Sequence, residues 1–530
     1  MPPKEEVLGF WKACFVGLSD HEESHFDRRI LLGLFILALL IRIPLLFFPE
    51  VIHNDGTAYI QHARQFLAGD WSVGRTHPLY PFLIALAHFV ARSDEIAGIL
   101  VSVILGALLV FPVFALGKTM FNERIGLIAA LFATFHPFLY IPSGSVLTES
   151  TFHFFLATSV LFGWRGFDRG RWSDILLFAF FGTLSYLTRP EGFAFLAIFV
   201  VWVLFVRPPR GERRWTRRVG LAVLASFFFV VFSFPYLLQL RKETGRWQIS
   251  KKVAVSVGSL SEDDGTGIEM IRVKKEMRLS SFLKEPFPVL KKIGLGLAQS
   301  LYVFQQVINP VLTVFLILAF VSKGGALFSQ KVTYYLFSYL LLFFGLIHPF
   351  FWLTRRYTSH VISICLPWAA FGFVQVTDWL RPRLEERKNG RSFPVFLLGA
   401  VLLVLFVQGR VIHNREHRFI QREAGLWMRD HLPRETKIMS SLPQEAFYAE
   451  LPWVRIPPGN SEEIVEAARS QGVRYLVIDE KVENESPGLQ VRLKGQGWVP
   501  IQEWQRKDQR TILFEIDRKR TETGRETRGQ

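Results

Sequence analysis

Long runs of apolar residues constrain this chain more than any other feature of its sequence. Two examples are residues 31–48 (LLGLFILALLIRIPLLFF) and 96–117 (IAGILVSVILGALLVFPVFALG). A helix rises about 1.5 Å per residue, so about 20 such residues cross the hydrocarbon core of a bilayer. Only 20% of the residues are charged, and they are segregated into a few stretches. The pattern indicates an α-helical polytopic membrane protein and excludes a cytosolic enzyme, a disordered chain and, with two cysteines, a disulfide scaffold.

Eleven apolar segments are candidate membrane spans: 30–48, 95–117, 124–141, 147–164, 174–188, 191–206, 219–240, 295–321, 332–350, 358–377 and 394–410. We place the N-terminal tail, residues 1–29, in the cytoplasm. The five short cytoplasmic loops then carry 18 Lys and Arg residues and the three short outer loops carry three, which is the positive-inside pattern. The net charge of +16 is therefore attributed to orientation in an anionic membrane, and no nucleic-acid partner is expected.

Two long segments lie outside the membrane under this threading. The first outer loop, 49–94, contains an amphipathic stretch with one apolar face, formed by Ile60, Ala63 and Leu67, which predicts a helix lying in the interface. Residues 78–90 are apolar but too short to span, so we expect a second interfacial or re-entrant helix there. The second large outer loop, 241–292, holds twelve basic residues, more than the outer side should carry.

The chain changes character after the transmembrane domain, which we place at residues 30–410. Residues 411–516 predict a small extracytoplasmic α/β domain. Its strand-like runs lie at 437–441 and 473–478 and its helical patterns at 417–431 and 461–470. The last stretch, 517–530, has no apolar residue to bury, and we expect it to be disordered.

Acidic and basic residues of the membrane part gather at the outer ends of the predicted spans. They are Asp55, Glu149 and Glu191, together with His53, Arg75, His77, Arg189, Arg355 and Arg356. An ionisable side chain in the hydrocarbon costs about 2.5–3.5 kcal/mol on insertion scales. Their placement on one side and at one depth indicates a site at the membrane face and differs from the mid-membrane path of an ion or proton transporter.

This arrangement suits the transfer of a sugar away from a lipid phosphate. The acceptor hydroxyl needs a general base, which an Asp can be, and Arg binds a departing phosphate better than Lys. A single displacement without an enzyme nucleophile would invert the anomeric centre. The structural alternative, a charge that snorkels or pairs at a helix end, stays open for Arg189 and Glu191 and is preferred for Arg42. Asp55 has no cation in the adjacent sequence and is the strongest candidate for the base.

Several sequence runs carry a family resemblance. They are HNDGTAYIQHARQFLAGDW (53–71), THPLYPFLIALAHFV (76–90), LTES (147–150), LTRPEG (187–192), RRYTSHVISICLPWAA (355–370) and, in the tail, LWMRDHLPRETKIMSSLPQEAFY and GVRYLVID. Together they resemble GT-C fold glycosyltransferases. The most similar group is the dolichyl-phosphate-mannose-protein mannosyltransferase and aminoarabinose transferase superfamily of bacterial membranes.

The resemblance implies an enzyme of the cell membrane that transfers a sugar from a polyprenyl-phosphate donor to a glycan, lipid or protein acceptor at the outer face. It implies that Asp55 is catalytic and that Glu149 matches the family's second acidic position. The remaining candidates bind the donor phosphate or substrate: Arg75, His77, Arg189, Glu191, Arg355, Arg356 and Tyr357. Some members hold a divalent cation near the acidic residues, so a metal on Asp55 and Glu149 stays open.

Two alternatives of other classes remain. A transporter or flippase for a lipid or glycan predicts broken helices or charges at mid-membrane in paired repeats. A catalytically silent member, which binds glycans or partners through its tail, predicts that substitution of Asp55 is tolerated.

Overall fold

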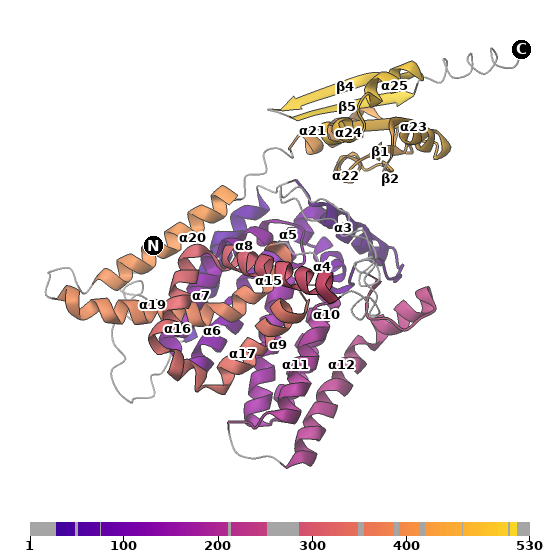
Figure 1. The fold of residues 1–530 in the computed structure, drawn as a ribbon. Coiled ribbons are helices and arrows are strands. Elements are labelled where there is room, and N and C mark those ends of the chain that lie inside the picture. The colour runs from indigo at the N-terminus through magenta and orange to yellow at the C-terminus, as the bar shows by residue number, and fades with distance from the viewer. Residues whose placement is uncertain are drawn as a thin grey trace, which may run out of the picture. The chain divides into compact units, whose positions relative to one another are not determined.

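The structure is a computed structural model (Figure 1). It describes residues 28–47, 51–74, 76–209, 214–251, 286–347, 355–385, 392–412, 419–457, 459–506 and 509–516. The chain divides into two compact units, Met1–Phe48 with His62–Ile412, and Pro49–Gln61 with His413–Gln530. The division falls within helix α3 (Asn54–Leu67), whose first half groups with the C-terminal unit. Both predicted tails, apart from the first helical residues, and most of loop 241–292 lie outside the described residues.

The membrane unit is helical throughout its described residues. Its first elements are α2 (Arg28–Arg42), η1 (Ile43–Leu46), α4 (Leu79–His88), α5 (Asp94–Leu108), α6 (Val110–Met120), α7 (Glu123–Phe135), α8 (Pro137–Tyr140), η2 (Ile141–Gly144), α9 (Glu149–Arg169) and α10 (Trp172–Thr188). They are followed by α11 (Gly192–Phe205), α12 (Trp215–Thr244), α15 (Pro286–Ile308), α16 (Pro310–Phe328), α17 (Lys331–Leu341), η3 (Leu342–Ile347), α18 (Arg355–Thr358), η4 (Ser359–Val361), α19 (Ile362–Glu385) and α20 (Phe393–Ile412). Helices α9 and α10 pack along each other, and α10 also contacts α11 and α12 (Figure 1).

Local sequence sets the ends of these helices. The side chain of Ser93 accepts a hydrogen bond from the amide of Ile96 at the start of α5, and Asn122 caps α7 in the same way. Gly170 and Gly245 end α9 and α12 in the left-handed conformation, at φ of 66° and 70°. A residue without a Cβ adopts this conformation without strain, which is why glycine closes helices.

Each of the eleven predicted spans falls on a helix or on consecutive helices, although α9, which matches 147–164, is not among the helices apolar enough to cross a membrane. Within the described residues, four helices are long and apolar enough to cross a membrane, or six if each of two bent pairs counts as one span. Several predicted spans coincide instead with shorter apolar helices, such as Trp172–Thr188 and Gly192–Phe205. The chain is therefore a multi-pass helical membrane protein, and the number eleven stays a prediction.

The first outer loop contains the two helices that the sequence predicts, but the predicted apolar face of the first is only partly buried. Helix α3 buries Ile60 and Ala63, whereas Leu67 is exposed at its end. Helix α4 has ten residues, which confirms that the apolar stretch at 78–90 is too short to span.

The predicted span 295–321 is a pair of helices with a sharp bend between them. Helices α15 and α16 meet at an angle of 106°, because Pro310 has no amide to continue the helix and Asn309 adopts a φ of 79°. The side chain of Asn309 accepts a hydrogen bond from the amide of Val311 at 3.0 Å and donates one to Gln408 on α20. The corner is therefore held by specific polar contacts.

A second bend, of 69°, separates α7 from the α8–η2 segment at Pro137. The two bends contact each other, since His136 Nε2 donates to the carbonyl oxygen of Ile308 at 3.2 Å. Arg42, which is fully buried, donates to the carbonyls of Thr134 and Leu139 on either side of the α7–α8 bend. The structural interpretation of Arg42 is thereby supported: its side chain satisfies carbonyls that the bend removes from helical hydrogen bonding.

The C-terminal unit is an α/β domain around a five-stranded sheet of order β2-β1-β3-β5-β4. Its elements are α21 (Phe419–His431), β1 (Ile438–Ser440), α22 (Gln444–Ala449), β2 (Trp453–Arg455), α23 (Ser461–Ser470), β3 (Tyr475–Asp479), α24 (Glu480–Glu485), α25 (Leu489–Gly495), β4 (Trp498–Arg506) and β5 (Gln509–Ile516). Strand β1 pairs in parallel with β2 and β3, and the hairpin of β4 and β5 adds antiparallel strands. The two predicted strands and two predicted helices are confirmed, whereas β2 and the hairpin were not predicted.

Replacing Arg42 by Met should destabilise the membrane unit strongly. The Met side chain keeps much of the aliphatic part of Arg42 but loses its hydrogen bonds to Ser143 and to the carbonyls of Ala38, Thr134 and Leu139. Of these carbonyls, that of Leu139 still accepts from the hydroxyl of Ser143. We expect a loss of about 3 kcal/mol or more, measured by unfolding of the purified chain in mixed detergent micelles. The control is Arg429→Met on the surface of the C-terminal domain, which should change stability by less than about 1 kcal/mol. Equal losses in the two variants would contradict the assigned role.

Candidate functional site

Glu149 is the centre of a buried cluster of charged side chains in the membrane unit. It is the first residue of α9, and only 1% of its surface is exposed. Its Oε1 accepts hydrogen bonds from Arg189 Nη1 at 3.3 Å and from Arg356 Nε at 2.7 Å. Arg189 follows the last residue of α10, and Arg356 lies in α18. Three elements that are distant in sequence therefore converge on one carboxylate oxygen.

The two arginines differ in their surroundings. Arg189 is 9% exposed, donates from Nη2 to Glu191 Oε1 at 3.2 Å, and its guanidinium lies over the rings of Phe152 and Tyr357. Arg356 is 31% exposed. Arg189 is thus fixed between two carboxylates and two aromatic rings, while Arg356 is the more accessible cation.

The geometry assigns Glu149 a positioning role. A carboxylate that accepts from two guanidinium groups is stabilised as the anion and is a weak base. Its second oxygen, Oε2, is buried and has no hydrogen-bond partner among the described residues. Glu149 is therefore suited to orient Arg189 and Arg356 and is poorly suited to remove a proton from an acceptor.

Arg355 and Tyr357 flank the cluster on α18. Arg355 is exposed and donates from Nε to Gln306 of α15 at 2.8 Å, and Tyr357 is 42% exposed. Glu149, Glu191, Arg189, Arg356 and Tyr357 are thus linked by direct contacts, whereas Arg355 contacts Gln306 instead. His153, one helical turn beyond Glu149, extends the cluster inwards by contacting Ser359 at 3.0 Å. The sequence analysis did not single out His153, although its i+4 spacing from Glu149 places both on one helix face.

Asp55 lies in the C-terminal unit, in the first turn of α3. The side chain is partly exposed. The loop before it is anchored from the far end of the chain, because the amide of Ile52 donates to the hydroxyl of Tyr448 on α22 at 2.8 Å. Val51, Ile52 and Tyr448 are all buried. The sequence analysis missed this role of Tyr448, since nothing in either segment signals the pairing.

The remaining predicted residues have different surroundings. His77 contacts the carbonyl oxygen of Tyr186 through Nδ1 at 2.8 Å and the hydroxyl of Ser250 through Nε2 at 2.9 Å. Both ring nitrogens therefore serve contacts within the protein, and we do not carry His77 into a phosphate site. His53 is buried in the C-terminal unit, and Arg75 lies outside the described residues.

The charged cluster does not fit a metal ion. Among the described residues, no group of three His, Cys, Asp or Glu side chains is placed to hold one. The exposed edge of the cluster is cationic, and the one carboxylate oxygen at its centre is shared by two arginines. A divalent cation would displace those pairs, so the residues present favour an anionic ligand.

Comparison with known proteins supports this interpretation of the fold. Residues 75–237 match the family model of the dolichyl-phosphate-mannose-protein mannosyltransferases. ArnT from Cupriavidus metallidurans bound to undecaprenyl phosphate has a TM-score of 0.59 at 12% identity, over 91% of this chain and 97% of that one. No curated protein matches the sequence.

Two other solved proteins are similar. The oligosaccharyltransferase of Archaeoglobus fulgidus, in complex with Zn and sulfate, has a TM-score of 0.53 at 14% identity over 89% of this chain and 72% of that one. The oligosaccharyltransferase AglB from Archaeoglobus fulgidus, in complex with an inhibitory peptide and a dolichol-phosphate, also has a TM-score of 0.53 at 14% identity, over 90% of this chain and 73% of that one. The mycobacterial arabinofuranosyltransferase AftD has a TM-score of 0.52 at 14% identity, over 93% of this chain and 40% of that one. The GT-C fold that the sequence predicts is thereby confirmed.

The ion pair between Glu149 and Arg189 should show a measurable coupling energy when each partner is replaced separately and then together. Glu149→Leu leaves two arginines without their shared anion, and removal of one member of a buried pair costs about 3–5 kcal/mol. The double variant Glu149→Leu/Arg189→Met should be less destabilised than the sum of the single variants, by more than about 1 kcal/mol. The measurement is a double-mutant cycle of unfolding in mixed micelles.

The control for this cycle is the surface pair Arg510–Glu503. Its N–O distance is 2.6 Å, but its side chains are 51% and 46% exposed. Solvent screening should keep its coupling near or below about 1 kcal/mol. Additive single changes at Glu149 and Arg189 would show that the cluster does not act as a unit.

Proposed function

We propose that this chain, which has the GT-C fold, is a membrane glycosyltransferase that transfers a sugar from a polyprenyl-phosphate donor to a hydroxyl acceptor at the outer face of the cytoplasmic membrane. The observation that carries the proposal is the pair of arginines held by Glu149. The family match over residues 75–237 and the fold shared with ArnT, which was solved with undecaprenyl phosphate, support the donor class.

Arg189 and Arg356 supply what a departing lipid phosphate needs. When the bond between the anomeric carbon and the phosphate oxygen breaks, that oxygen takes the electron pair and gains negative charge. A guanidinium binds such an oxygen with charge-assisted hydrogen bonds, and one fixed in advance costs no reorganisation during the reaction. Glu149 fixes both guanidinium groups, and the partial exposure of Arg356 makes it the proposed direct contact to the phosphate.

Asp55 is the proposed general base. It would take the proton of the acceptor hydroxyl as the acceptor oxygen forms its bond to the anomeric carbon. The polyprenyl phosphate leaves in the same displacement, so the anomeric configuration is inverted. The assignment is supported by the partial exposure of Asp55 and by the weak basicity of Glu149, the other acidic candidate.

Tyr448 is the proposed positioning residue for this base. Its hydroxyl accepts the amide hydrogen of Ile52, three residues before Asp55, and both partners are buried. A catalytic group displaced by 1 Å can lose about 100-fold in rate, so a fixed backbone next to the base matters for the chemistry. The C-terminal domain would thereby contribute to catalysis without contacting the substrate.

The transporter alternative has one observation in its favour, which is the pair of bent helices. Discontinuous helices in transporters offer freed backbone groups to the substrate. Here the carbonyls of Thr134 and Leu139 accept from Arg42, and that of Ile308 accepts from His136. These groups are already bound within the protein, which favours the transferase.

Asp55→Asn should abolish sugar transfer while leaving donor binding intact. The amide keeps the size and hydrogen-bonding capacity of the side chain but cannot accept the proton. We expect the turnover of a radiolabelled polyprenyl-phosphate hexose pool, in membranes with equal amounts of protein, to fall by about 100-fold or more. Binding of polyprenyl phosphate to the purified chain should change less than about twofold.

The matched control is Asp70→Asn in the same loop. Asp70 is exposed and accepts a hydrogen bond from the amide of Ser72 at 2.9 Å. Asp70→Asn therefore removes one negative charge, as Asp55→Asn does, but leaves the proposed base in place. Equal turnover in wild type and Asp55→Asn would remove Asp55 from the mechanism. No sugar turnover in either wild type or Asp55→Asn, together with transbilayer movement of the donor, would favour the transporter.

Tyr448→Phe should lower kcat and leave KM for the donor nearly unchanged. Loss of one buried hydrogen bond is worth about 1 kcal/mol, or about fivefold in rate if it is spent on positioning Asp55. The control is Tyr475→Phe in the same domain, whose hydroxyl contacts Glu515 at 3.1 Å. If both variants lose kcat equally, Tyr448 contributes to domain stability only.

A further inference from the structure

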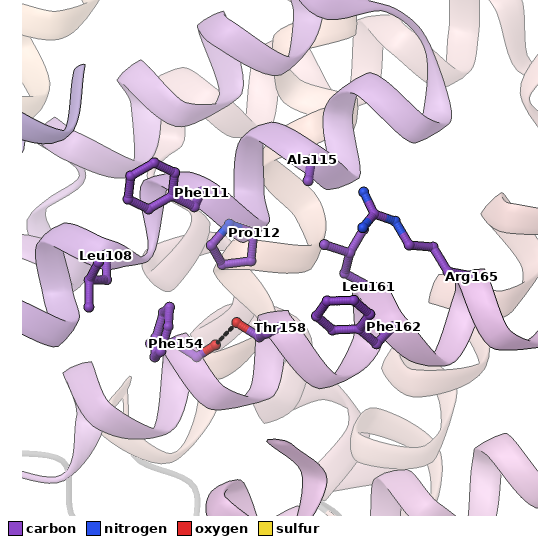
Figure 2. A pocket seen from close by; sticks show the side chains of 9 residues that line it. All are labelled: Leu108, Phe111, Pro112, Ala115, Phe154, Thr158, Leu161, Phe162 and Arg165. Carbon is purple, nitrogen blue, oxygen red and sulfur yellow. Dashed lines mark hydrogen bonds between the residues drawn. The ribbon is translucent and has the colours of Figure 1, made fainter. Parts of the chain in front are cut away.

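A cavity of about 270 Å³ lies between α9 and the α5–α6 pair (Figure 2). Its lining comes from the end of α5, from α6 and from one face of α9: Leu108, Phe111, Pro112, Ala115, Phe154, Thr158, Leu161, Phe162 and Arg165. Figure 2 shows Leu108 and Phe154 at one end and the guanidinium of Arg165 at the other. The hydroxyl of Thr158 donates to the carbonyl oxygen of Phe154 at 2.7 Å, so it adds little polarity to the wall. The cavity is therefore apolar with a single cation at one end.

This cavity is separate from the Glu149 cluster, although both involve α9. At 3.6 residues per turn, Phe154, Thr158 and Arg165 lie about 140–180° around the helix from Glu149. Arg165 is also 16 residues from Glu149, which is about 24 Å along the helix axis, most of the thickness of a hydrocarbon core. The cavity thus lies on the opposite face of α9, and in the threading predicted from the sequence its charged end lies towards the cytoplasmic side.

Arg165 lacks a hydrogen-bond acceptor within the described part of the chain. Its Nε is buried and unpartnered, and its guanidinium carbon lies 5.6 Å from the centre of the Phe162 ring. The charged side chains that act on it are Arg169, which repels it, and Asp174, which attracts it. A donor shielded from water without an acceptor is costly, so the arrangement calls for an anionic ligand at this end of the cavity.

We propose that this cavity binds one acyl chain of an anionic phospholipid whose phosphate accepts hydrogen bonds from Arg165. The aromatic and aliphatic walls contact the methylene groups of the acyl chain. The guanidinium matches the geometry of a phosphodiester better than an ammonium group would. In the threading predicted from the sequence, residues 165–173 face the cytoplasm, where the leaflet is rich in anionic lipids. The inference does not rest on the proposed glycosyltransferase activity.

The same chemistry, a phosphate with an apolar tail, also describes a polyprenyl-phosphate donor. Position favours the phospholipid, since the proposed donor phosphate site is at the Glu149 end of α9 and on its other face. A single cation such as Arg165 also suits a phosphodiester with one charge. The experiment distinguishes the two sources directly.

The test is a titration of the full-length chain in detergent, followed by native mass spectrometry. The ligands are phosphatidylglycerol, phosphatidylcholine with the same acyl chains, and polyprenyl phosphate. We expect wild type to retain phosphatidylglycerol about five- to tenfold better than phosphatidylcholine, because one arginine near an anionic headgroup raises the affinity by about that factor. Arg165→Met should bring this ratio to about one, and Arg169→Met, which removes the same charge outside the cavity, should preserve it.

Two further results show whether the lipid binds in the cavity and whether it is a phospholipid or the polyprenyl phosphate. Ala115→Phe fills the cavity and should weaken binding of both phospholipids, in protein that remains monodisperse. A wild-type ratio of one, or equal losses in Arg165→Met and Arg169→Met, would overturn the proposal. A loss of polyprenyl phosphate but not of phosphatidylglycerol in Arg165→Met would also overturn it and would identify the cavity as a second donor site.

Discussion

The two hydrogen bonds that Glu149 Oε1 accepts from Arg189 and Arg356 are the interaction on which the charged site depends. Without the carboxylate, two guanidinium groups would repel each other in a poorly hydrated place, and without the arginines a buried carboxylate would be costly. The pairing also joins α9, the end of α10 and α18, which are distant in sequence. Because this carboxylate is committed to cations, our proposal assigns the general base to another residue, Asp55.

Buried backbone groups also need partners, as the buried charges do. A carbonyl freed by a bend finds no water in the hydrocarbon, so each bend needs a side-chain donor or acceptor of its own. Arg42 and His136 meet this need at the α7–α8 bend and at the end of α15, and Asn309 binds Gln408 at the corner that follows. Residues that look like functional charges in an apolar sequence can therefore be structural. Arg42 is the clear case, and burial with backbone acceptors distinguishes it from the partly exposed Arg356.

Much of the fold follows from the sequence because apolar length and turn residues are local signals. The predicted spans fall on helices, and the gathering of Glu149, Arg189 and Arg356 follows from counting helix ends on one side of the membrane. The corner at Asn309 was missed, because a proline within an apolar run is compatible with both a kinked and a broken helix. The hydrogen bond between Ile52 and Tyr448 could not be predicted, since it joins residues 396 positions apart and neither segment has a distinctive pattern. The contacts of His77 with the carbonyl oxygen of Tyr186 and the hydroxyl of Ser250 could not be predicted either, and its part in substrate binding stays a prediction.

Helix α9 contributes residues to both the charged cluster and the apolar cavity. Its buried face begins with Glu149 and continues through His153, so polar contacts are concentrated at one end and within the bundle. The opposite face carries Phe154, Phe162 and Arg165, which form an apolar cavity with a cation at the other end. In the threading predicted from the sequence, the two ends of α9 lie in different leaflets, so a charge at each end would meet a different population of phosphates. The cluster, with two arginines on a fixed carboxylate, suits a phosphate that changes charge during a reaction, whereas a single half-buried arginine beside an apolar cavity suits a phosphate that stays bound.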